Sequence, residues 1–331
     1  MRKKTQSEAV LKITVCGALA LCAGFYGGQA RAAIIRSPDA NTLVLWHLEE
    51  TTADQFGGSS PNIADFEDSS GNNHHGIGRD IAADQLVMGQ PGVLGLATQH
   101  NGPAALPQPL GKRNFITRTG TITTEWTGTN SFTFEAWVKN PGSLSDADSS
   151  ATTGTGRVIG MSRDSAVAWS LGIINTGQLR VFSNNGVPNP LDPPNNYPSL
   201  VLTSSALTWE TDVWYYVALV SNDAATPDVS TAQWTVYRAK DGDIALGSPV
   251  INVEAKRSAP QNGFGVGGDT NTSDDGLNRA FRGFIDEAHF SKGARSESYL
   301  TGALVPEPSS SFLVGCAVIG FAAARRRRAG G

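Results

Sequence analysis

The residues best equipped for chemistry are an aspartate-led loop and a pair of adjacent carboxylates far downstream. The loop reads Asp68-Ser69-Ser70-Gly71-Asn72-Asn73, and the pair is Asp286-Glu287. Ca²⁺ takes roughly six to eight oxygen ligands from carboxylates, amides and loop carbonyls. We therefore predict Asp68, Asn73 and Asp286 as calcium ligands. The alternative is structural: Asp68 would cap an Asx-turn, and Asp286 would accept hydrogen bonds from loop amides.

Two patterns of adjacent residues disfavour other site chemistries. Neighbouring side chains of a strand point to opposite faces, so neither Glu49-Glu50 nor Asp286-Glu287 should place both carboxylates on one face. The same holds for His74-His75, and no other histidine lies at ligand spacing, so we expect no zinc site. The sequence contains no Gly-x-Ser-x-Gly elbow and no phosphate-binding loop. A catalytic pair of carboxylates that comes from two separate strands is an alternative that the sequence leaves open.

Aromatic side chains could bind a glycan, because their flat rings offer apolar contact area beside polar groups. Strand alternation assigns Trp169, Trp214 and Trp234 to the interior. Tyr197 and Trp209 lie near the proline-rich segment of the chain, and they are the candidate ligand-binding residues. A purely structural role for both is the alternative.

These residues must be positioned by β-structure. Short runs rich in Val, Ile, Phe, Trp and Thr recur between clusters of Gly, Asn, Asp and Pro, which is typical of strands. Away from the chain ends, no long segment keeps a helical period and no repeat has a fixed spacing. We predict an all-β fold, a two-sheet antiparallel jelly-roll sandwich. Its expected strands are 43–48, 132–138, 166–174, 178–183, 214–220, 233–239, 244–253, 264–266 and 284–290, with polar loops at 140–156, 184–199 and 269–278.

The N-terminal end has the composition of an export signal. Basic residues precede an apolar stretch at 13–25, and Ala30-Arg31-Ala32 follows it. This order predicts a signal peptide over residues 1–32, removed after its last alanine by signal peptidase. A lipoprotein is the alternative, because Cys22 lies in the apolar stretch, although Leu21 stands where a lipobox has a small residue.

The C-terminal end combines a Pro-Glu-Pro box, an apolar run and an arginine cluster. The run 312–324 has 13 residues, fewer than the roughly 20 that span a bilayer, and the arginines would hold its end on the cytoplasmic side. This order resembles the PEP-CTERM sorting signal of Gram-negative bacteria. The resemblance implies transient anchoring in the inner membrane and cleavage near the box by an exosortase-type membrane protease. An ordinary single-span tail anchor is the alternative. The residues of the signal are Pro306, Glu307, Pro308, Arg325, Arg326, Arg327 and Arg328, divided between a linker at 302–311 and a hydrophobic helix with its arginine cluster at 312–331.

Trimming both ends would change the chemistry of what remains. All three cysteines, Cys16, Cys22 and Cys316, lie in the terminal segments, so the domain between them has no disulfide and no cysteine nucleophile. Nine of the 26 basic residues would be lost. Of the 30 acidic residues only Glu8 would be lost if Glu307 is retained, which shifts the net charge from −4 to about −12. We therefore expect no nucleic-acid partner.

Four stretches occur in one order along the domain. They are the strand at 45–50 with the Asp-Ser-Ser-Gly-Asn loop that follows it, the strand at 132–139 ending in Ala-Trp-Val-Lys, the run Trp-Tyr-Tyr-Val-Ala at 214–218, and Gly-Phe-Ile-Asp-Glu at 283–287. Together they resemble the concanavalin A-like lectin/glucanase fold in its laminin-G-like bacterial branch, over residues 33–301. The spacer 77–131 departs from that pattern. The resemblance implies that the first and last strands are close, which would bring Asp68 and Asp286 together.

The combined expectation is an exported, C-terminally sorted, non-catalytic binding or matrix protein. The resemblances imply a place at the cell surface or in the extracellular matrix or biofilm of a Gram-negative bacterium. They imply recognition of an extracellular glycan or surface protein, with Ca²⁺ organising one loop edge. Two alternatives stay open: a polysaccharide-degrading enzyme on the same fold and a purely structural surface coat. Glycoside hydrolases on this scaffold place carboxylates in a Glu-x-Asp-x-x-Glu run, which Asp286-Glu287 does not match.

Overall fold

All the described residues lie between Ala33 and Glu307. The computed structural model describes residues 36–51, 66–79, 86–100, 115–118, 131–140, 157–164, 167–174, 176–184, 199–226, 231–256, 263–268 and 281–304. Tyr197, the polar loops at 141–156, 185–198 and 269–280, the signal peptide at 1–32 and the whole sorting signal from Pro306 to Arg328 lie outside these residues. Within the described residues, no helix has the length and hydropathy needed to cross a membrane.

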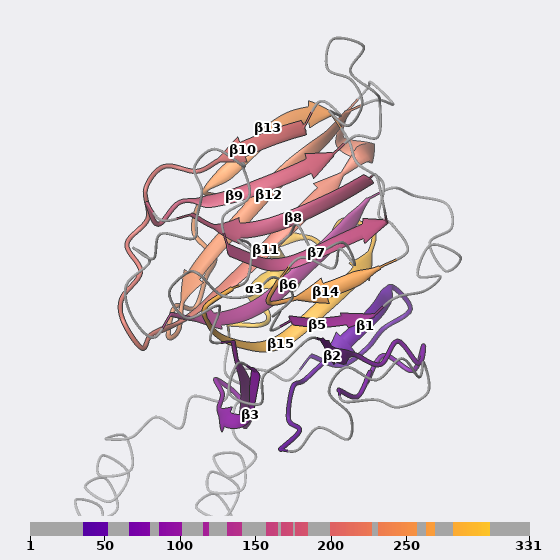
Figure 1. Cartoon of the computed structure of the whole chain (residues 1–331). Coiled ribbons are helices and arrows are strands. Elements are labelled where there is room, and N and C mark those ends of the chain that lie inside the picture. Colours follow the sequence, from indigo (N-terminus) through magenta and orange to yellow (C-terminus); the bar gives the residue numbers. More distant parts are fainter. Residues whose placement is uncertain are drawn as a thin grey trace, which may run out of the picture. The chain divides into compact units, whose positions relative to one another are not determined.

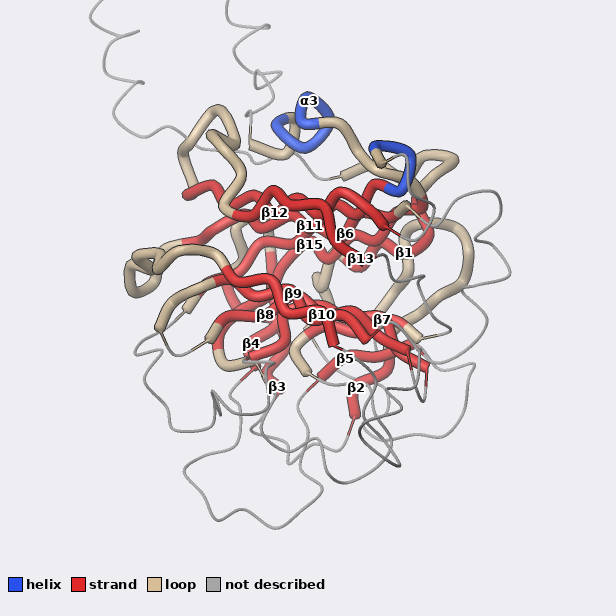
Figure 2. Tube along the Cα trace, turned by 90° about the horizontal axis from the view of Figure 1, so that it is seen from above, coloured by secondary structure: helices blue, strands red, loops and turns tan. Residues whose placement is uncertain are grey.

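The strands form two antiparallel sheets, which face each other as two layers (Figures 1 and 2). The first sheet contains, in spatial order, β13 (Ile251–Lys256), β12 (Thr231–Lys240), β11 (Trp214–Asn222), β6 (Phe132–Lys139), β15 (Gly283–Lys292), β4 (Leu96–His100) and β3 (Leu86–Pro91), with β1 (Thr42–Trp46) also paired to β15. The second contains β10 (Ser199–Thr203), β9 (Leu179–Asn184), β8 (Val167–Ile173), β7 (Arg157–Asp164), β14 (Phe264–Val266), β5 (Phe115–Arg118) and β2 (Ile77–Arg79).

Alternating apolar residues fill the space between the sheets. On β6, Phe132, Phe134, Ala136 and Val138 all belong to the inner core, as their spacing predicts. Phe132 stacks on Trp169 of the opposite sheet, with ring centroids 4.7 Å apart. The interior position predicted for Trp169 is therefore confirmed, and so is the one predicted for Trp234. These contacts position the outward-facing residues of both sheets.

A second apolar cluster covers the outer face of the first sheet. Helix α3 (Glu297–Thr301) lies on this face, outside the layer formed by β12, β11, β6 and β15 (Figure 2). Its Leu300 packs with Ala303 and Leu304 against Trp137 and Tyr216. Ser296 caps the helix, because its side chain accepts a hydrogen bond from the backbone N–H of Tyr299. The cluster fixes the chain just before the predicted sorting signal.

The predicted all-β, two-sheet antiparallel sandwich is confirmed. One predicted strand is shorter than expected: residues 244–250 are irregular, and β13 begins at Ile251. Gly247 adopts a φ of +69°, and Pro249 has no N–H to donate to a ladder, so this segment cannot extend the strand. The spacer 77–131 contains β2, β3, β4 and β5, and two further strands, β7 and β10, were not predicted.

Candidate functional site

The carboxylate of Asp68 organises the loop that follows β1. Its Oδ1 accepts hydrogen bonds from the N–H groups of Leu45 and Ser70, at 2.9 and 3.0 Å. Its Oδ2 accepts from the hydroxyl of Ser70 at 2.6 Å and from the N–H of His74 at 2.8 Å. Both oxygens of this buried side chain are therefore engaged by protein donors. This is the Asx-type arrangement that the sequence left as the alternative to calcium binding.

Asn73 occupies the tightest part of the same loop. Its φ of +59° lies in the left-handed region, which asparagine adopts more readily than most residues. The preceding Asn72 holds the loop against β1, because its amide donates to the carbonyl oxygens of Thr42 and Leu43. The Asn73 side chain is exposed. In this structure Asn73 is a turn residue next to the Asp68 carboxylate.

Asp286 lies where β15 changes its pairing partner. Residues 283–285 pair with β4, whereas 288–291 pair with β1. Against β6 on the other side, Asp286 pairs with Trp137 and His289 pairs with Glu135, so two residues of β15 face one of β6. This is a β-bulge, and Glu287 within it has a φ of +52°.

The bulge overturns the expectation that Asp286 and Glu287 are separated on opposite faces. Ile285 and Ala288 both pack in the inner core, so the regular alternation is interrupted between them. The charge of Glu287 consequently acts on Asp286. Burial of Asp286, reinforced by that charge, raises its carboxyl pKa well above the ordinary 3.8.

The Asp286 carboxylate accepts hydrogen bonds from the turn between β3 and β4. Its Oδ2 accepts from the N–H groups of Val93 and Leu94, at 2.8 and 3.2 Å. A Cβ on Gly92 would lie 2.5 Å from that oxygen, so only glycine allows this close approach. The other oxygen, Oδ1, is buried and has no hydrogen-bond partner among the described residues. Asp286 thus bonds loop amides, as the structural alternative required.

Two further carboxylates, Glu49 and Glu287, act on Asp286 through their charge. Glu49 accepts from the N–H of Leu96 at 3.0 Å. Glu287 contacts His47, whose Nδ1 lies 2.8 and 2.9 Å from its two carboxylate oxygens. That hydrogen bond raises the pKa of His47, while burial raises the pKa of Glu287. Asp286 and the exposed Glu49 thus both accept from residues 93–96, and the buried Glu287 lies beside Asp286 in the bulge.

The structure does not join the three predicted calcium ligands in one cluster. Asp68 bonds residues of β1 and its own loop, whereas Asp286 bonds the β3–β4 turn. Among the residues that the structure describes, no group of three or more His, Cys, Asp or Glu side chains could hold a metal ion. Calcium binding at Asp68, Asn73 and Asp286 stays a prediction from the sequence.

Trp209, one of the two predicted ligand-binding aromatics, is half-buried and has structural contacts. Its indole N–H donates to the carbonyl of Gly177 at 2.6 Å. Its ring meets Tyr215 edge-on with centroids 4.9 Å apart, and the guanidinium of Arg238 lies 4.9 Å from its ring centroid. These contacts hold the segment between β10 and β11 against the sandwich.

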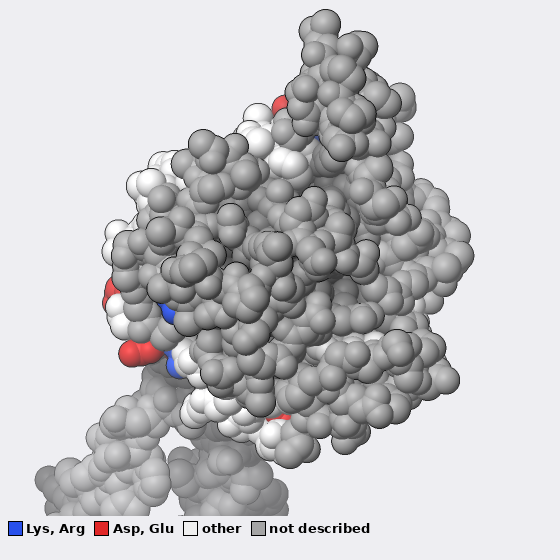
Figure 3. Space-filling model, viewed as in Figure 1, with Lys and Arg blue, Asp and Glu red and all other residues white. Residues whose placement is uncertain are grey.

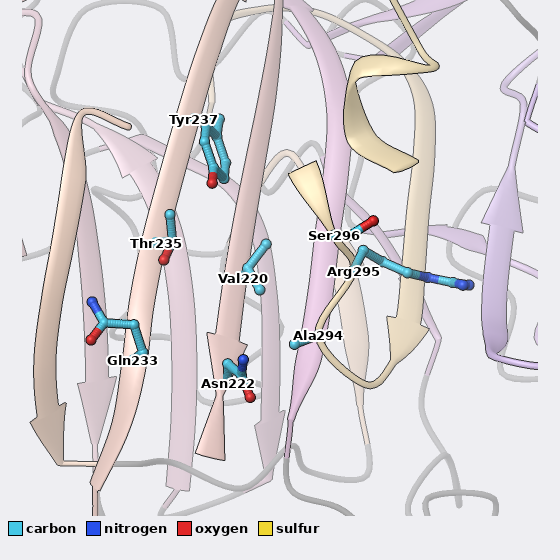
Figure 4. A pocket seen from close by; sticks show the side chains of 8 residues that line it. All are labelled: Val220, Asn222, Gln233, Thr235, Tyr237, Ala294, Arg295 and Ser296. Carbon is cyan, nitrogen blue, oxygen red and sulfur yellow. The ribbon is translucent and has the colours of Figure 1, made fainter. Parts of the chain in front are cut away.

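A groove of about 330 Å³ lies on the outer face of the first sheet (Figure 4). Its floor is formed by β11 and β12, and its wall by the segment between β15 and α3. The lining residues are polar except for two small apolar positions and one tyrosine ring. They are Val220, Asn222, Gln233, Thr235, Tyr237, Ala294, Arg295 and Ser296.

Strand register builds this groove. Val220 pairs with Thr235 and Asn222 pairs with Gln233, so these side chains share one face of the sheet. The wall is held away from them by Thr133 on β6. Its hydroxyl donates to the carbonyl of Gly293 at 3.0 Å and accepts from the N–H of Arg295 at 2.9 Å. The segment thus covers β6 and leaves uncovered the parts of β11 and β12 that line the groove.

The sequence contained one signal for this groove that our prediction did not use. Gln233, Thr235 and Tyr237 alternate with the buried residues Ala232, Trp234 and Val236. This pattern identifies an outward-facing polar row with an aromatic end. The wall residues carried no such signal, because their position depends on contacts with Thr133, more than 150 residues away.

No family model matches the sequence, and no curated protein matches it. Among solved structures, the chain is similar to domain 4 of AbnA, a GH43 extracellular arabinanase from Geobacillus stearothermophilus, in complex with arabinotriose. That similarity has 15% identity and a TM-score of 0.49, and it covers 80% of this chain and 98% of that domain.

Two further similarities extend over half or less of the other chain. The botulinum neurotoxin serotype G binding domain matches at 10% identity and TM-score 0.45, over 79% of this chain and 50% of that one. Trypanosoma rangeli sialidase matches at 13% identity and TM-score 0.44, over 81% of this chain and 33% of that one. With TM-scores below 0.5, these similarities carry no argument about ligand or activity.

Proposed function

We propose that the chain is an exported, C-terminally sorted protein whose sandwich is a non-catalytic binding or matrix domain. Its ligand is an extracellular glycan or a surface protein. The observation that carries this proposal is the groove on the outer face of β11 and β12, with its amide, hydroxyl and aromatic lining. Concave sites with a few convergent polar groups are the usual place for ligands. The basic-apolar N-terminus and the Pro-Glu-Pro tail support export and sorting.

The non-catalytic part of the proposal rests on the lining of the groove and on the burial of three carboxylates. The described residues that line the groove include no Asp, Glu, His or Cys. Asp286 and Glu287 are buried, at 0% and 4% exposure, and Glu135 is buried at 1%. Glycoside hydrolysis uses two carboxyl groups that flank an accessible bond. These three side chains are instead bonded to the protein's own groups.

A binding screen with matched variants tests the proposal. The full chain, purified in a sugar-free detergent, is applied to arrays of glycans and of extracellular matrix proteins. The double variant Asn222→Ala/Tyr237→Ala should lose the signal, whereas Ile244→Ala should keep it, because Ile244 is 74% exposed and does not line the groove. Binding that survives the double variant would place the site elsewhere. Release of reducing ends from a bound polysaccharide would instead support the enzyme.

Export and sorting are tested separately. The tagged chain is expressed in a Gram-negative host with and without an exosortase-type protease, and the mature ends are determined by mass spectrometry. We expect an N-terminus at Ala33 in both hosts and loss of the arginine cluster only with the protease. A chain that keeps both ends in the two hosts would contradict the sorting proposal.

A further inference from the structure

We propose that the groove binds the end of an uncharged saccharide, with the Tyr237 ring as its apolar contact and Asn222 as its main hydrogen-bonding group. This inference rests on the proposed function and narrows it to one class of ligand. The charge, the polarity and the size of the groove all favour this ligand.

The lining supplies no unpaired charge to an anionic ligand. Arg295 is the charged residue among the described lining residues, and its guanidinium points away from the groove (Figure 4). It donates to both carboxylate oxygens of Asp39, at 2.6 and 2.7 Å, and lies 4.3 Å from the ring centroid of Tyr299. The hydrogen bond from Arg295 is the main cause that lowers the pKa of Asp39, so both partners stay charged and neutralise each other.

The surroundings of the groove do not favour an anion either. Burial, with the negative charge of Glu297, raises the pKa of the Tyr237 phenol. The phenol therefore stays neutral at physiological pH, and the nearby charge is acidic. Figure 3 views the molecule from the side of the second sheet, away from the groove, and the charged side chains of described residues that are visible there form isolated spots. An acidic sugar would thus be repelled at this site, whereas an uncharged one would not.

The uncharged polar groups of the lining are suited to binding the hydroxyl groups of a sugar. The Asn222 side-chain oxygen accepts from the N–H of Ala224 at 3.1 Å, which orients the amide at the end of β11. An asparagine amide has two N–H donors and can still accept, so it can serve a sugar hydroxyl in either role. Val220 and Ala294 add apolar surface near the Tyr237 ring. A pyranose has the same combination of apolar C–H faces and equatorial hydroxyls.

The size of the groove favours a small group over a protein surface. Its volume of about 330 Å³ is at the lower end of ligand pockets, which span roughly 300–1,000 Å³. A stable protein interface would instead bury about 800 Å² on each partner. The groove is therefore matched to a terminal sugar of a glycan chain.

Calorimetric titration of the full chain in sugar-free detergent tests this inference. The probes are three sets of oligosaccharides of equal length: uncharged gluco-, manno- and galacto-oligosaccharides, oligo-uronates, and chito-oligosaccharides deacetylated to amines. We expect binding of an uncharged set, with no change in affinity between 50 and 500 mM salt. Tyr237→Ala should weaken it about tenfold or more. Tyr237→Phe should retain most of it, since the ring remains.

The matched controls separate a groove effect from misfolding. Thr203→Ala, on the edge strand of the opposite sheet, and the exposed Ile244→Ala should bind like the parent chain. Each variant should also keep the parent melting temperature within a few degrees. Groove-dependent binding of oligo-uronates, amino sugars or a matrix protein would overturn this inference and leave the proposed function standing. Binding that does not depend on Tyr237 or Asn222 would overturn this inference alone, and absence of any glycan or matrix-protein binding would overturn both.

Discussion

Nδ1 of His289 lies 2.8 Å from Oε1 of Glu135, and the two side chains are 0% and 2% exposed. The other carboxylate oxygen accepts from the guanidinium of Arg36 at 2.8 Å and from the hydroxyl of Tyr216. Arg36 also donates to the carbonyl of Tyr299 at 3.1 Å. One buried carboxylate therefore ties the N-terminal segment of the domain to helix α3, next to the wall of the groove.

Removing this charge should destabilise the whole domain. Glu135→Gln keeps one acceptor oxygen but removes the negative charge that Arg36 and His289 share in a buried site, for which we expect a loss of about 3–5 kcal/mol in the free energy of unfolding. Urea unfolding of the full chain in detergent measures it. The control is Glu254→Gln on the exposed part of β13, which should change stability by about 0.5 kcal/mol or less. Equal losses of unfolding free energy in the two variants would show that the buried network around Glu135 does not stabilise the domain.

The same carboxylate predicts a dependence of stability on acid. Burial opposes its charge, but the hydrogen bond and charge of His289 and the charge of Arg36 outweigh it and lower the pKa of Glu135 from 4.5 to about 2. Its contribution is therefore complete above about pH 4.5 and lost as the pH falls toward 2. Over that window the parent chain should lose about 3 kcal/mol more than Glu135→Gln. If the stability of the two chains changes in parallel with pH, the lowered pKa of Glu135 is contradicted.

Asp286 should behave in the opposite way. Since its pKa is raised by burial, the folded chain charges this group less readily than the unfolded chain does. The penalty is absent below the ordinary pKa of 3.8 and grows as the pH rises toward the folded value. Asp286→Asn keeps an acceptor for Val93 and Leu94 but removes the charge.

The stability of Asp286→Asn relative to the parent chain should therefore rise by more than about 1 kcal/mol between pH 4 and pH 8. Denaturant unfolding at both pH values is the measurement. Asp212→Asn is the matched control, because Asp212 is exposed and its φ of +58° suits asparagine. A constant difference between Asp286→Asn and the parent would show that the carboxyl is not perturbed.

The parts of the fold that follow from local alternation could be read from the sequence. The inner face of β6 was predicted because Phe132 and Phe134 alternate with polar residues, which is the two-residue period of a strand with one apolar face. The strands of the spacer 77–131 were missed. Three of them are only 3–5 residues long, and all of them pair within this same spacer or with distant strands. Short strands carry too few residues to display a period.

The site could be read from the sequence only in part. The Ser, Gly and Asn residues that follow Asp68 are typical of a turn, so the sequence already offered an Asx-turn as the role of Asp68. The bulge at Asp286 and Glu287 was not, because glutamate gives no local sign that it will adopt a positive φ. A bulge arises where β15 must pair with β4 at one end and β1 at the other, and that competition is a property of the whole sheet.

Asp68→Ala separates the structural role of this carboxylate from calcium binding. Four donors lose their acceptor, so stability should fall by about 2–4 kcal/mol even in excess EDTA. The exposed neighbour Glu67→Ala is the control and should change little. Thermal unfolding of the full chain with EDTA and then with added Ca²⁺ tests the metal itself. A calcium-dependent rise in melting temperature that Asp68→Ala and Asp286→Ala both abolish would support the predicted site. Identical melting temperatures of the parent chain in the two buffers would refute it, leaving both aspartates as acceptors for loop amides.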